Sequence, residues 1–220
     1  MKKSMLICGA DGFIGKSALE YFKEDYEITA TIFNKDNPSR GVVEDVDYLS
    51  IDLRNEKDVI DLFERKQYDV VLQLAATTTG AKDVVERPYV HVTDNTVMNA
   101  WIFREAMRTN VGHLLFPSCT VMYQPKEYPQ SEEAWSPLDE MYSAYFGVGN
   151  MKVFCEKMCD FYSRLGTTKF TAFRHSNVYG PYDKFDLDKC HVVPAFVNKV
   201  TNAQKSLEIW GSGQASRDII

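Results

Sequence analysis

Short apolar runs alternate along most of the chain with longer segments in which apolar residues recur every three or four positions. The runs end at turn residues, as buried strands do, and the longer segments have the period of amphipathic helices. The pattern predicts strands at Met5–Cys8, Glu27–Phe33, Val70–Ala75, His113–Pro117 and Lys169–Arg174. It predicts helices at Phe13–Lys23, Glu56–Arg65, Asn95–Thr109 and Gly149–Arg164. Because parallel strands need helical crossovers, we expect an α/β fold with a doubly wound parallel sheet.

The alternation of strands and helices stops after about residue 176. Turn residues follow at Tyr179–Asp183, and one more helix is predicted at Val192–Val200. We therefore expect two parts, a first domain over residues 1–176 and the beginning of a smaller C-terminal lobe over residues 177–220.

Charge and cysteine content exclude several classes of function. The 220 residues include 25 Lys and Arg against 31 Asp and Glu, a formal net charge of −6. The chain therefore lacks the basic field that attracts nucleic acid or an anionic membrane. Its five cysteines are odd in number and form no C-x-x-C pair, which indicates reduced intracellular thiols rather than a disulfide framework or a zinc site. No apolar run has the length of a signal-peptide core or a membrane span, so we expect a cytoplasmic protein.

Three glycines follow the first predicted strand and open the first helix, with the spacing G-x-x-G-x-x-G. Such glycines permit a tight turn, let the backbone approach a pyrophosphate and let the helix pack closely on the sheet, while the helix N-terminus favours a phosphate. The turn predicts a dinucleotide-binding domain of the Rossmann type; an ordinary strand-to-helix turn is the alternative. The expected cofactor contacts here are Gly9, Asp11, Gly12, Phe13, Ile14 and Gly15.

With this turn the chain resembles the extended short-chain dehydrogenase/reductases, which include the nucleotide-sugar epimerases, dehydratases and reductases. Later segments resemble the family in the same order, among them Asp69–Ala76, with Gln73 where a histidine is common, and the R-x-x-N-V-Y-G-P segment Arg174–Pro181. The resemblance covers essentially the whole chain. It implies further cofactor contacts at Asp52, Leu53, Leu74, Ala75 and Ala76 and a substrate contact at Asn177.

The residues after the second predicted strand bear on the choice between NAD and NADP. An acidic residue at this point usually accepts the ribose hydroxyls of NAD. Here the chain has no acid before Asp36. Asn34 and Lys35 suit a 2′-phosphate, with Arg40 nearby, so we favour NADP(H) over NAD(H). The alternative is that both are solvated loop residues.

The chemistry of this family requires a group that moves a proton while the cofactor carries hydride at a sugar carbon. The usual signature is Tyr-x-x-x-Lys on a helix, because four residues place both side chains on one face. Lys152 matches the lysine, as catalytic partner and cofactor contact, but Val148 holds the tyrosine position. We predict that Tyr145 is the acid, brought to Lys152 by an irregular helix start at the two intervening glycines. The alternative is that Tyr145 is a core aromatic and the tyrosine role is lost.

A segment that ends at Tyr123 resembles the family's S-S-x-x-V-Y sequence, in which a serine or threonine holds the substrate oxygen. Ligands of open α/β sheets bind at this carboxyl edge. Counting back from Tyr123 selects Cys119, counting from Met122 selects Ser118, and Thr120 is adjacent. Ser118 and Cys119 stay candidates for catalysis and Thr120 for substrate contact. A structural role as a small buried residue is the alternative for the cysteine.

Two C-terminal segments, Asn177–Phe185 and Cys190–Ala195, resemble the branch of the family that epimerises and then reduces a GDP-linked 4-keto-6-deoxy sugar with NADPH. Proton exchange beside the ketone needs a second acid–base pair, and the family implies a cysteine and a histidine. The resemblance places these roles on Cys119 and His191. A histidine titrates near neutral pH, which suits an acid at this step. The alternative for His191 is a helix cap or a packed side chain.

These features together predict an NAD(P)-dependent enzyme that epimerises or reduces a nucleotide sugar. A 4-epimerase, a 4,6-dehydratase, and an NAD(P)-binding regulator or subunit with little catalysis are the alternatives. The resemblance implies a homodimer through the helices Asn95–Thr109 and Gly149–Arg164. The last segment, Ile209–Ile220, resembles an internal segment of the family with Arg217 as a substrate contact, so we expect the substrate lobe to be incomplete.

Overall fold

The computed structural model describes residues 2–33, 41–78, 86–124, 126, 128–138, 140–187, 190–203, 206–207, 209, 212–214, 216 and 218–220. Within these ranges six parallel strands form one sheet in the order β3-β2-β1-β4-β5-β6. The strands are β1 (Lys3–Cys8), β2 (Tyr26–Ile32), β3 (Asp47–Ser50), β4 (Val70–Gln73), β5 (His113–Cys119) and β6 (Lys169–His175). The strand order reverses between β1 and β4, the point at which such sheets bind ligands beyond their carboxyl ends.

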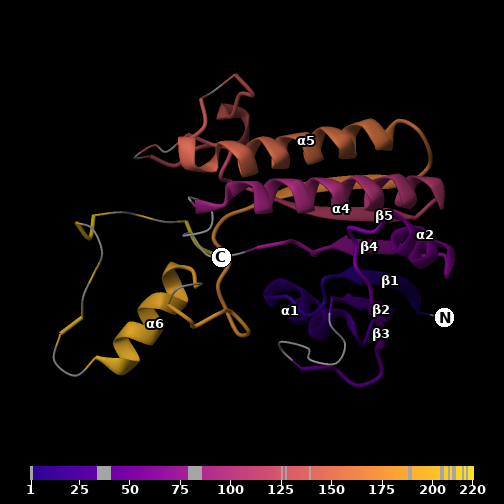
Figure 1. Cartoon of the computed structure of the whole chain (residues 1–220), viewed down its shortest axis with the longest axis horizontal. Coiled ribbons are helices and arrows are strands. Elements are labelled where there is room, and N and C mark those ends of the chain that lie inside the picture. Colours follow the sequence, from indigo (N-terminus) through magenta and orange to yellow (C-terminus); the bar gives the residue numbers. More distant parts are fainter. Residues whose placement is uncertain are drawn as a thin grey trace.

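Helices cover both faces of the sheet (Figure 1). On one face α2 (Glu56–Glu64), α4 (Pro88–Arg108) and α5 (Phe146–Ser163) pack, with α4 and α5 side by side. On the other face lies α1 (Phe13–Phe22). The last helix, α6 (Val192–Asn202), lies apart from the sheet, beyond its carboxyl edge. Two short 3-10 turns, η1 (Glu132–Ala134) and η2 (Ser143–Tyr145), precede α5.

The central strand β1 explains why the first apolar run is continuous rather than alternating. Its last five residues are all buried. Leu6 and Cys8 face the core beneath α2, α4 and α5, whereas Met5 and Ile7 face the core beneath α1. A parallel strand with helices on both faces has no polar side, so both sets of alternating positions are apolar.

Local chemistry determines where the helices begin. Asn55 caps α2, since its Oδ1 accepts hydrogen bonds from the backbone N–H groups of Lys57 at 2.9 Å and Asp58 at 3.4 Å. Glu56 and Asp58 place negative charge in the first turn, where the helix dipole favours it. At the start of α4, Pro88 occupies a first-turn position that needs no backbone donor.

The predicted fold class is confirmed, and each predicted strand is present with ends within two residues of those expected. The prediction placed a third strand before Asp52 but gave it no bounds, since the four residues of β3 are exposed or half-buried and make no apolar run. The expected helix Asn95–Thr109 begins earlier, at Pro88, because polar residues in its first turns interrupt the apolar period. The helix expected at Gly149 likewise begins at Phe146.

The last residues of the chain pair with the segment that follows β6. Asn177 and Ile219 form an isolated parallel bridge. Ile220 N–H donates to Asn177 O at 3.1 Å, and Tyr179 N–H donates to Ile220 O at 3.0 Å. The division between residues 176 and 177 and the incomplete lobe stay predictions.

Candidate functional site

The glycine-rich turn joins β1 to α1 where the strand order reverses. Gly9 has a φ of +73°, and a Cβ at this position would lie 2.5 Å from Ala75 Cα. A Cβ on Gly15 would lie 2.1 Å from Gly9 O. Backbone atoms fill both spaces, so both positions require glycine. The turn thereby brings the loop after β4 and the start of α1 close to the backbone of Gly9.

The N-terminus of α1 has the properties of an anion site. Gly12 is the N-cap residue and offers no side-chain oxygen to the N–H groups of the first turn, which also contains no acidic residue. The unpaired N–H groups and the dipole of a helix end favour a negative ligand. Asp11, Phe13 and Ile14 flank this end and are half-buried. The glycine turn Gly9–Gly15 and the N-terminus of α1, together called the cradle, therefore fit the pyrophosphate of a dinucleotide.

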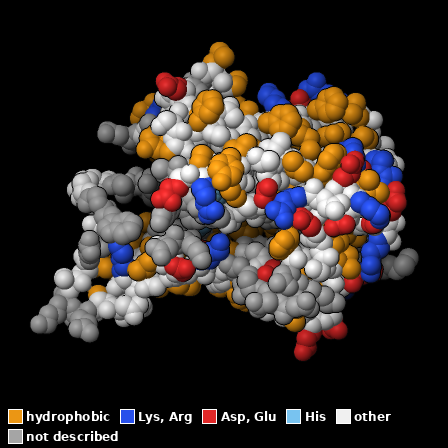
Figure 2. Space-filling model, viewed as in Figure 1, with side chains coloured by type: hydrophobic (Ala, Val, Ile, Leu, Met, Phe, Trp, Pro, Cys, Tyr) orange, Lys and Arg blue, Asp and Glu red, His pale blue; other side chains and the backbone are white. Residues whose placement is uncertain are grey.

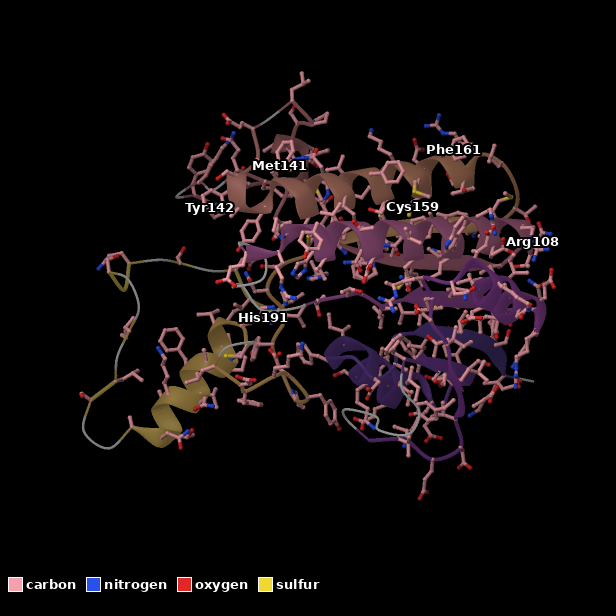
Figure 3. The ribbon with its side chains drawn as sticks, in the orientation of Figure 1. Arg108, Met141, Tyr142, Cys159, Phe161 and His191 are labelled. Atoms are coloured by element: carbon pink, nitrogen blue, oxygen red, sulfur yellow. The ribbon has the colours of Figure 1, made fainter. Side chains whose placement is uncertain are left out.

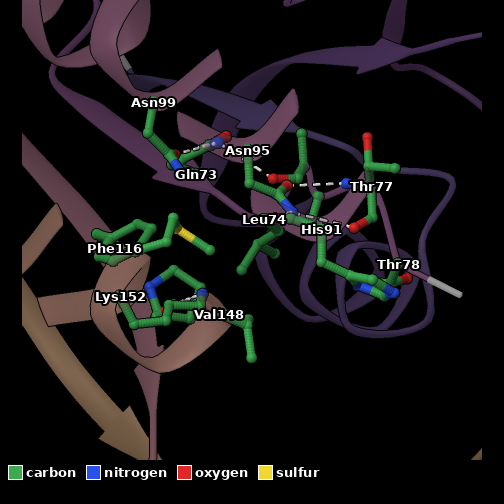
Figure 4. Close-up of a pocket in the computed structure, with 14 residues that line it drawn as sticks. Gln73, Leu74, Thr77, Thr78, His91, Asn95, Asn99, Phe116, Val148 and Lys152 are labelled. Carbon is green, nitrogen blue, oxygen red and sulfur yellow. Dashed lines mark hydrogen bonds between the residues drawn. The ribbon is translucent and has the colours of Figure 1, made fainter. Parts of the chain in front are cut away.

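A pocket of about 100 Å³ opens beside the turn, between the loop after β4, α4 and α5 (Figure 4). Asn95 on α4 holds this loop: its Oδ1 accepts from Thr77 N–H at 2.9 Å, and its Nδ2 donates to Thr77 O at 3.0 Å and His91 O at 2.7 Å. Gln73 Nε2 donates to Ala75 O at 3.1 Å. The residues of this loop that were expected to contact cofactor all line the pocket, namely Leu74, Ala75 and Ala76.

Lys152 reaches the pocket from α5. Its Nζ donates to Pro117 O at 2.8 Å and lies 4.7 Å from the centre of the Phe116 ring. Burial lowers the pKa of Lys152, because it disfavours the charged ammonium, and nearby Cys119 and Glu156 partly oppose this effect. An ammonium has three N–H donors, so a ligand in the pocket has donors to accept from besides the one directed at Pro117.

The tyrosine position of the family's signature is occupied here by an apolar side chain that lines the pocket. Val148, one turn before Lys152, lies beside it (Figure 4). Tyr145 is the N-cap residue of α5 and is 37% exposed, with its ring 5.8 Å from that of Tyr142. It is not among the residues that line the pocket.

The expected irregular helix start is not present between Tyr145 and Lys152. Helix α5 is continuous from Phe146 onward, through both intervening glycines. Seven residues of helix separate the two positions by about 10 Å of rise. The structure therefore brings Val148 and Lys152 together, and does not bring Tyr145 to this pocket.

The three candidate residues at the end of β5 differ in burial. Ser118 is fully buried, and its Oγ has no hydrogen-bond partner among the residues that the structure describes. Cys119 is half-buried, and burial raises the pKa of its thiol, although the charge of Lys152 acts in the opposite direction. Thr120 is exposed in the following bend. A buried hydroxyl without a partner is uncommon and marks Ser118 as a candidate ligand.

The segment after β3 has a structural role in the described residues. Arg54 binds the carboxylate of Asp52 with two hydrogen bonds of 2.9 Å and also donates to Asp94 at 3.0 Å. This contact lowers the pKa of Asp52. Leu53 is buried in the core beneath α2. Three predicted contacts, Asn34, Lys35 and Arg217, lie outside the described residues.

His191 is the N-cap residue of α6, at the end of that helix nearest the sheet (Figure 3). Its side chain is 73% exposed, and Nδ1 lies 3.9 Å from Oδ1 of Asp183. In the described part of the chain no hydrogen bond joins it to Cys119, its expected partner. Asn177 Nδ2 donates to Asp218 O at 2.9 Å, so its amide serves the C-terminal bridge.

An ion pair that the sequence analysis did not predict joins α5 to β6. Arg174 donates to both carboxylate oxygens of Glu156, at 3.0 and 2.8 Å, and to Tyr123 Oη at 2.7 Å. Its guanidinium lies 4.6 Å from the centre of the Trp135 ring. The motifs contain Arg174 and Glu156, but 18 residues separate them and no sequence signal pairs them. The sequence analysis likewise did not predict that Asp183 lies next to His191.

In the described residues no group of three or more His, Cys, Asp or Glu side chains is placed to hold a metal ion. Among the same residues no helix is long and apolar enough to span a bilayer.

Comparisons with known proteins confirm the family resemblance. The model of the NAD dependent epimerase/dehydratase family matches residues 5–220. GDP-L-fucose synthase of Sinorhizobium fredii is 28% identical over 99% of this chain and 66% of its own length. GDP-L-colitose synthase of Yersinia pseudotuberculosis is 26% identical over 98% of this chain and 67% of its own length. The chain thus spans about two thirds of the length of these relatives.

Solved structures show the same fold. A UDP-glucose 4-epimerase of Thermotoga maritima, solved with UDP-glucose, superposes with a TM-score of 0.84 at 21% identity, over 99% of this chain and 69% of its own. A GDP-L-fucose synthetase of Naegleria fowleri bound to NADP superposes with a TM-score of 0.78 at 21% identity, over 99% of this chain and 68% of its own. At these identities the likeness shows a shared fold.

Proposed function

Since the chain belongs to the NAD-dependent epimerase/dehydratase family, we propose that it binds NAD(P)(H) across the carboxyl edge of its sheet and modifies a nucleotide sugar. The observation that carries the proposal is the cradle at Gly9 and Gly15, which only backbone can fill, beside a pocket that Lys152 enters. Relatives named as synthases of GDP-linked deoxy sugars support a GDP-linked 4-keto-6-deoxy substrate. The reaction proposed is epimerisation followed by reduction.

The proposed position of the cofactor follows from the geometry of the carboxyl edge of the sheet. The N-terminus of α1 would hold the pyrophosphate. Lys152, which lines the pocket, would donate a hydrogen bond to the cofactor there. For the adenosine end we propose NADP(H), because Asn34 and Lys35 replace the usual acid. Lys16 supports this preference, since its Nζ reaches the segment after β2 and donates to Gly41 O at 3.3 Å.

The bound cofactor supplies hydride, and the side chains of this chain supply protons and hydrogen bonds. Ser118 Oγ, buried without a partner among the described residues, donates to the sugar oxygen in the proposed complex. Lys152 places positive charge beside the oxygen that becomes negative. Tyr145 is the proposed proton donor, from its position at the start of α5 outside the pocket. Cys119 and His191 are the proposed acid–base pair for proton exchange beside the ketone.

A second candidate function is cofactor binding with little catalysis, and Val148 at the tyrosine position favours it. The two candidates differ in what they do to NADPH. Incubation of the purified chain with NADPH and a GDP-4-keto-6-deoxy sugar should deplete the nicotinamide absorbance if the chain is a reductase. Fluorescence quenching by NADPH without any loss of absorbance would overturn the proposed activity and support binding alone.

The Tyr145→Phe variant tests the proton donor separately. We expect its turnover to fall about 100-fold or more, the usual contribution of a positioned acid, with NADPH binding unchanged. An unchanged rate would exclude Tyr145. The Val148→Tyr variant restores the Tyr-x-x-x-Lys spacing, and a gain in turnover there, with no loss in Tyr145→Phe, would show that the wild-type chain lacks this group.

We also propose a homodimer through α4 and α5. Large apolar side chains gather on the outer side of these helices (Figure 2). Four large apolar side chains of these helices are half or more exposed: Tyr89 at 65%, Phe146 at 64%, Phe154 at 50% and Phe161 at 55%. Contiguous exposed apolar surface of this kind is typical of an interface. A second copy of the chain offers the same surface and pairs with it by two-fold symmetry.

A further inference from the structure

Asp183 is a buried acid close to the exposed ring of His191. Its side chain is 4% exposed, whereas that of His191 is 73% exposed. Oδ1 accepts from Lys184 N–H at 2.7 Å and lies 3.9 Å from His191 Nδ1. Oδ2 is buried and has no hydrogen-bond partner in the described part of the chain. A buried carboxylate is costly unless it has partners, and here one oxygen has a single backbone donor and the other has none.

The backbone around Asp183 is held against the cofactor domain. Tyr182 Oη donates to the carboxylate of Glu20 on α1 at 2.8 Å. The ammonium of Lys16, also on α1, lies 5.9 Å from the centre of the Tyr182 ring. Asp183 N–H donates to Gly180 O at 3.4 Å. Because α1 begins at the glycine-rich turn, these contacts fix Asp183 relative to the proposed pyrophosphate seat.

His191 is placed differently, since it begins α6 and belongs to the segment beyond the sheet. The contact between Nδ1 and Oδ1 links this segment to the acid that is fixed on α1. At 3.9 Å it is an ion-pair distance for a protonated ring and is longer than a hydrogen bond. Catalytic hydrogen bonds are often long in structures without substrate.

We infer that Asp183 is the positioning residue of His191: its carboxylate accepts the Nδ1–H of the ring and leaves Nε2 directed at the ligand. A histidine that donates from one nitrogen to a carboxylate is fixed in tautomer and orientation. This inference rests on the proposed function, in which His191 exchanges a proton beside the ketone of the sugar. The inference adds Asp183 as the residue that determines which ring nitrogen of His191 exchanges the proton.

The tautomer of His191 tests the inference without any turnover. The full chain is labelled with ¹⁵N-histidine, and the His191 signals are assigned by their loss in His191→Gln. We expect the neutral ring of the wild type to carry its proton on Nδ1. In Asp183→Ala this preference should be lost. Asp183→Asn should restore part of it, because the amide oxygen can still accept. Asp186→Asn, an exposed acid in the same segment, is the matched control and should match the wild type.

A proton on Nε2 in the wild type, or the same tautomer in the wild type and Asp183→Ala, would overturn the inference. The wild-type measurement alone decides the first case, so the test does not depend on the folding of a variant.

Proton exchange separates this inference from the proposed function. In D₂O with the GDP-4-keto sugar, we expect Asp183→Ala to slow exchange at the carbons beside the ketone by about 10- to 100-fold, with KM little changed. Asp183→Asn should recover part of the rate. A tautomer change in Asp183→Ala with unchanged exchange in both Asp183→Ala and His191→Gln supports the positioning contact and overturns the catalytic role of His191.

Discussion

Alanine in place of Gly9 perturbs the point at which three backbone segments meet. The substitution has two costs that the structure separates. The first is conformational: a φ of +73° costs a residue with a side chain about 1–2 kcal/mol. The second is steric, because the new Cβ would lie 2.5 Å from Ala75 Cα and 2.7 Å from Ala75 N. Displacing packed atoms in this way costs about 1–3 kcal/mol. The free energy of unfolding should fall by about 2–5 kcal/mol in total.

Gly41 is the matched control for the steric cost. Its φ of +70° is nearly the same, but among the described residues, chain neighbours aside, no atom would lie within 4 Å of a Cβ there. Gly41→Ala should therefore lose only the conformational part, about 1–2 kcal/mol. Each kcal/mol corresponds to roughly 2–4 °C in Tm for a chain of this size, so thermal or urea unfolding distinguishes the two variants.

The same two variants test whether the turn at Gly9 binds the cofactor. A ligand at 100 times its Kd stabilises the native state by about 2.7 kcal/mol. At the NADPH concentration that meets this condition for the wild type, Gly41→Ala should keep the full stabilisation. Gly9→Ala moves the turn, and a tenfold weaker affinity would reduce the stabilisation to about 1.4 kcal/mol. Equal losses of stability in both variants, with the full NADPH shift in both, would refute the close approach of Gly9 to Ala75 as the reason for glycine.

Three further predictions concern the ion pair, a histidine and the outer surface. Glu156→Gln should lower the free energy of unfolding by about 3 kcal/mol, because Arg174 loses a counter-ion that is 16% exposed. Asp160→Asn is the control on the same helix: its pair with Arg164 is exposed, so the free energy should change by less than about 1 kcal/mol. Equal losses for the two variants in urea unfolding would contradict this prediction. Burial lowers the pKa of His175 from 6.5, so as the pH falls the unfolded chain takes up a proton before the native chain does. The free energy of unfolding should therefore fall as the pH drops below about 6.5. His175→Gln should flatten this decline in unfolding curves, and an unchanged slope would contradict the prediction. The proposed dimer should appear for the wild type in analytical ultracentrifugation, and Phe161→Glu should convert it to a monomer; a monomeric wild type, or a variant that stays dimeric, would contradict the proposed interface.

The sequence alone was enough to predict the sheet and the cofactor turn. Buried parallel strands have apolar residues on both faces, so β1 and β4 appear as continuous runs. The turn at Gly9–Gly15 is local, because its glycines meet backbone from the residues that follow β1 and from one neighbouring loop. The start of α4 was less predictable, since Thr93 and Asp94 interrupt the apolar period and the helix is stabilised by packing against α5.

The catalytic set depended on distances that a sequence pattern does not contain. Glycines at positions 147 and 149 permit an irregular helix start, but tertiary packing selects a regular one: a Cβ on Gly149 would lie 2.7 Å from Met141 Sδ, so the small residue accommodates a neighbour rather than a kink. Val148 consequently faces the pocket, and Tyr145 lies at the helix end.

Periodicity and spacing by themselves predicted the doubly wound sheet and the glycine turn, because these depend on residues close in the chain and on the burial of whole strands. The resemblance of the motifs predicted the family, which the family model confirms. The tertiary structure decided which side chains meet. It paired Arg174 with Glu156 and Asp183 with His191, and it left Ser118 Oγ buried without a partner among the described residues. Such contacts join separate elements, and their geometry follows from how helices pack on the sheet.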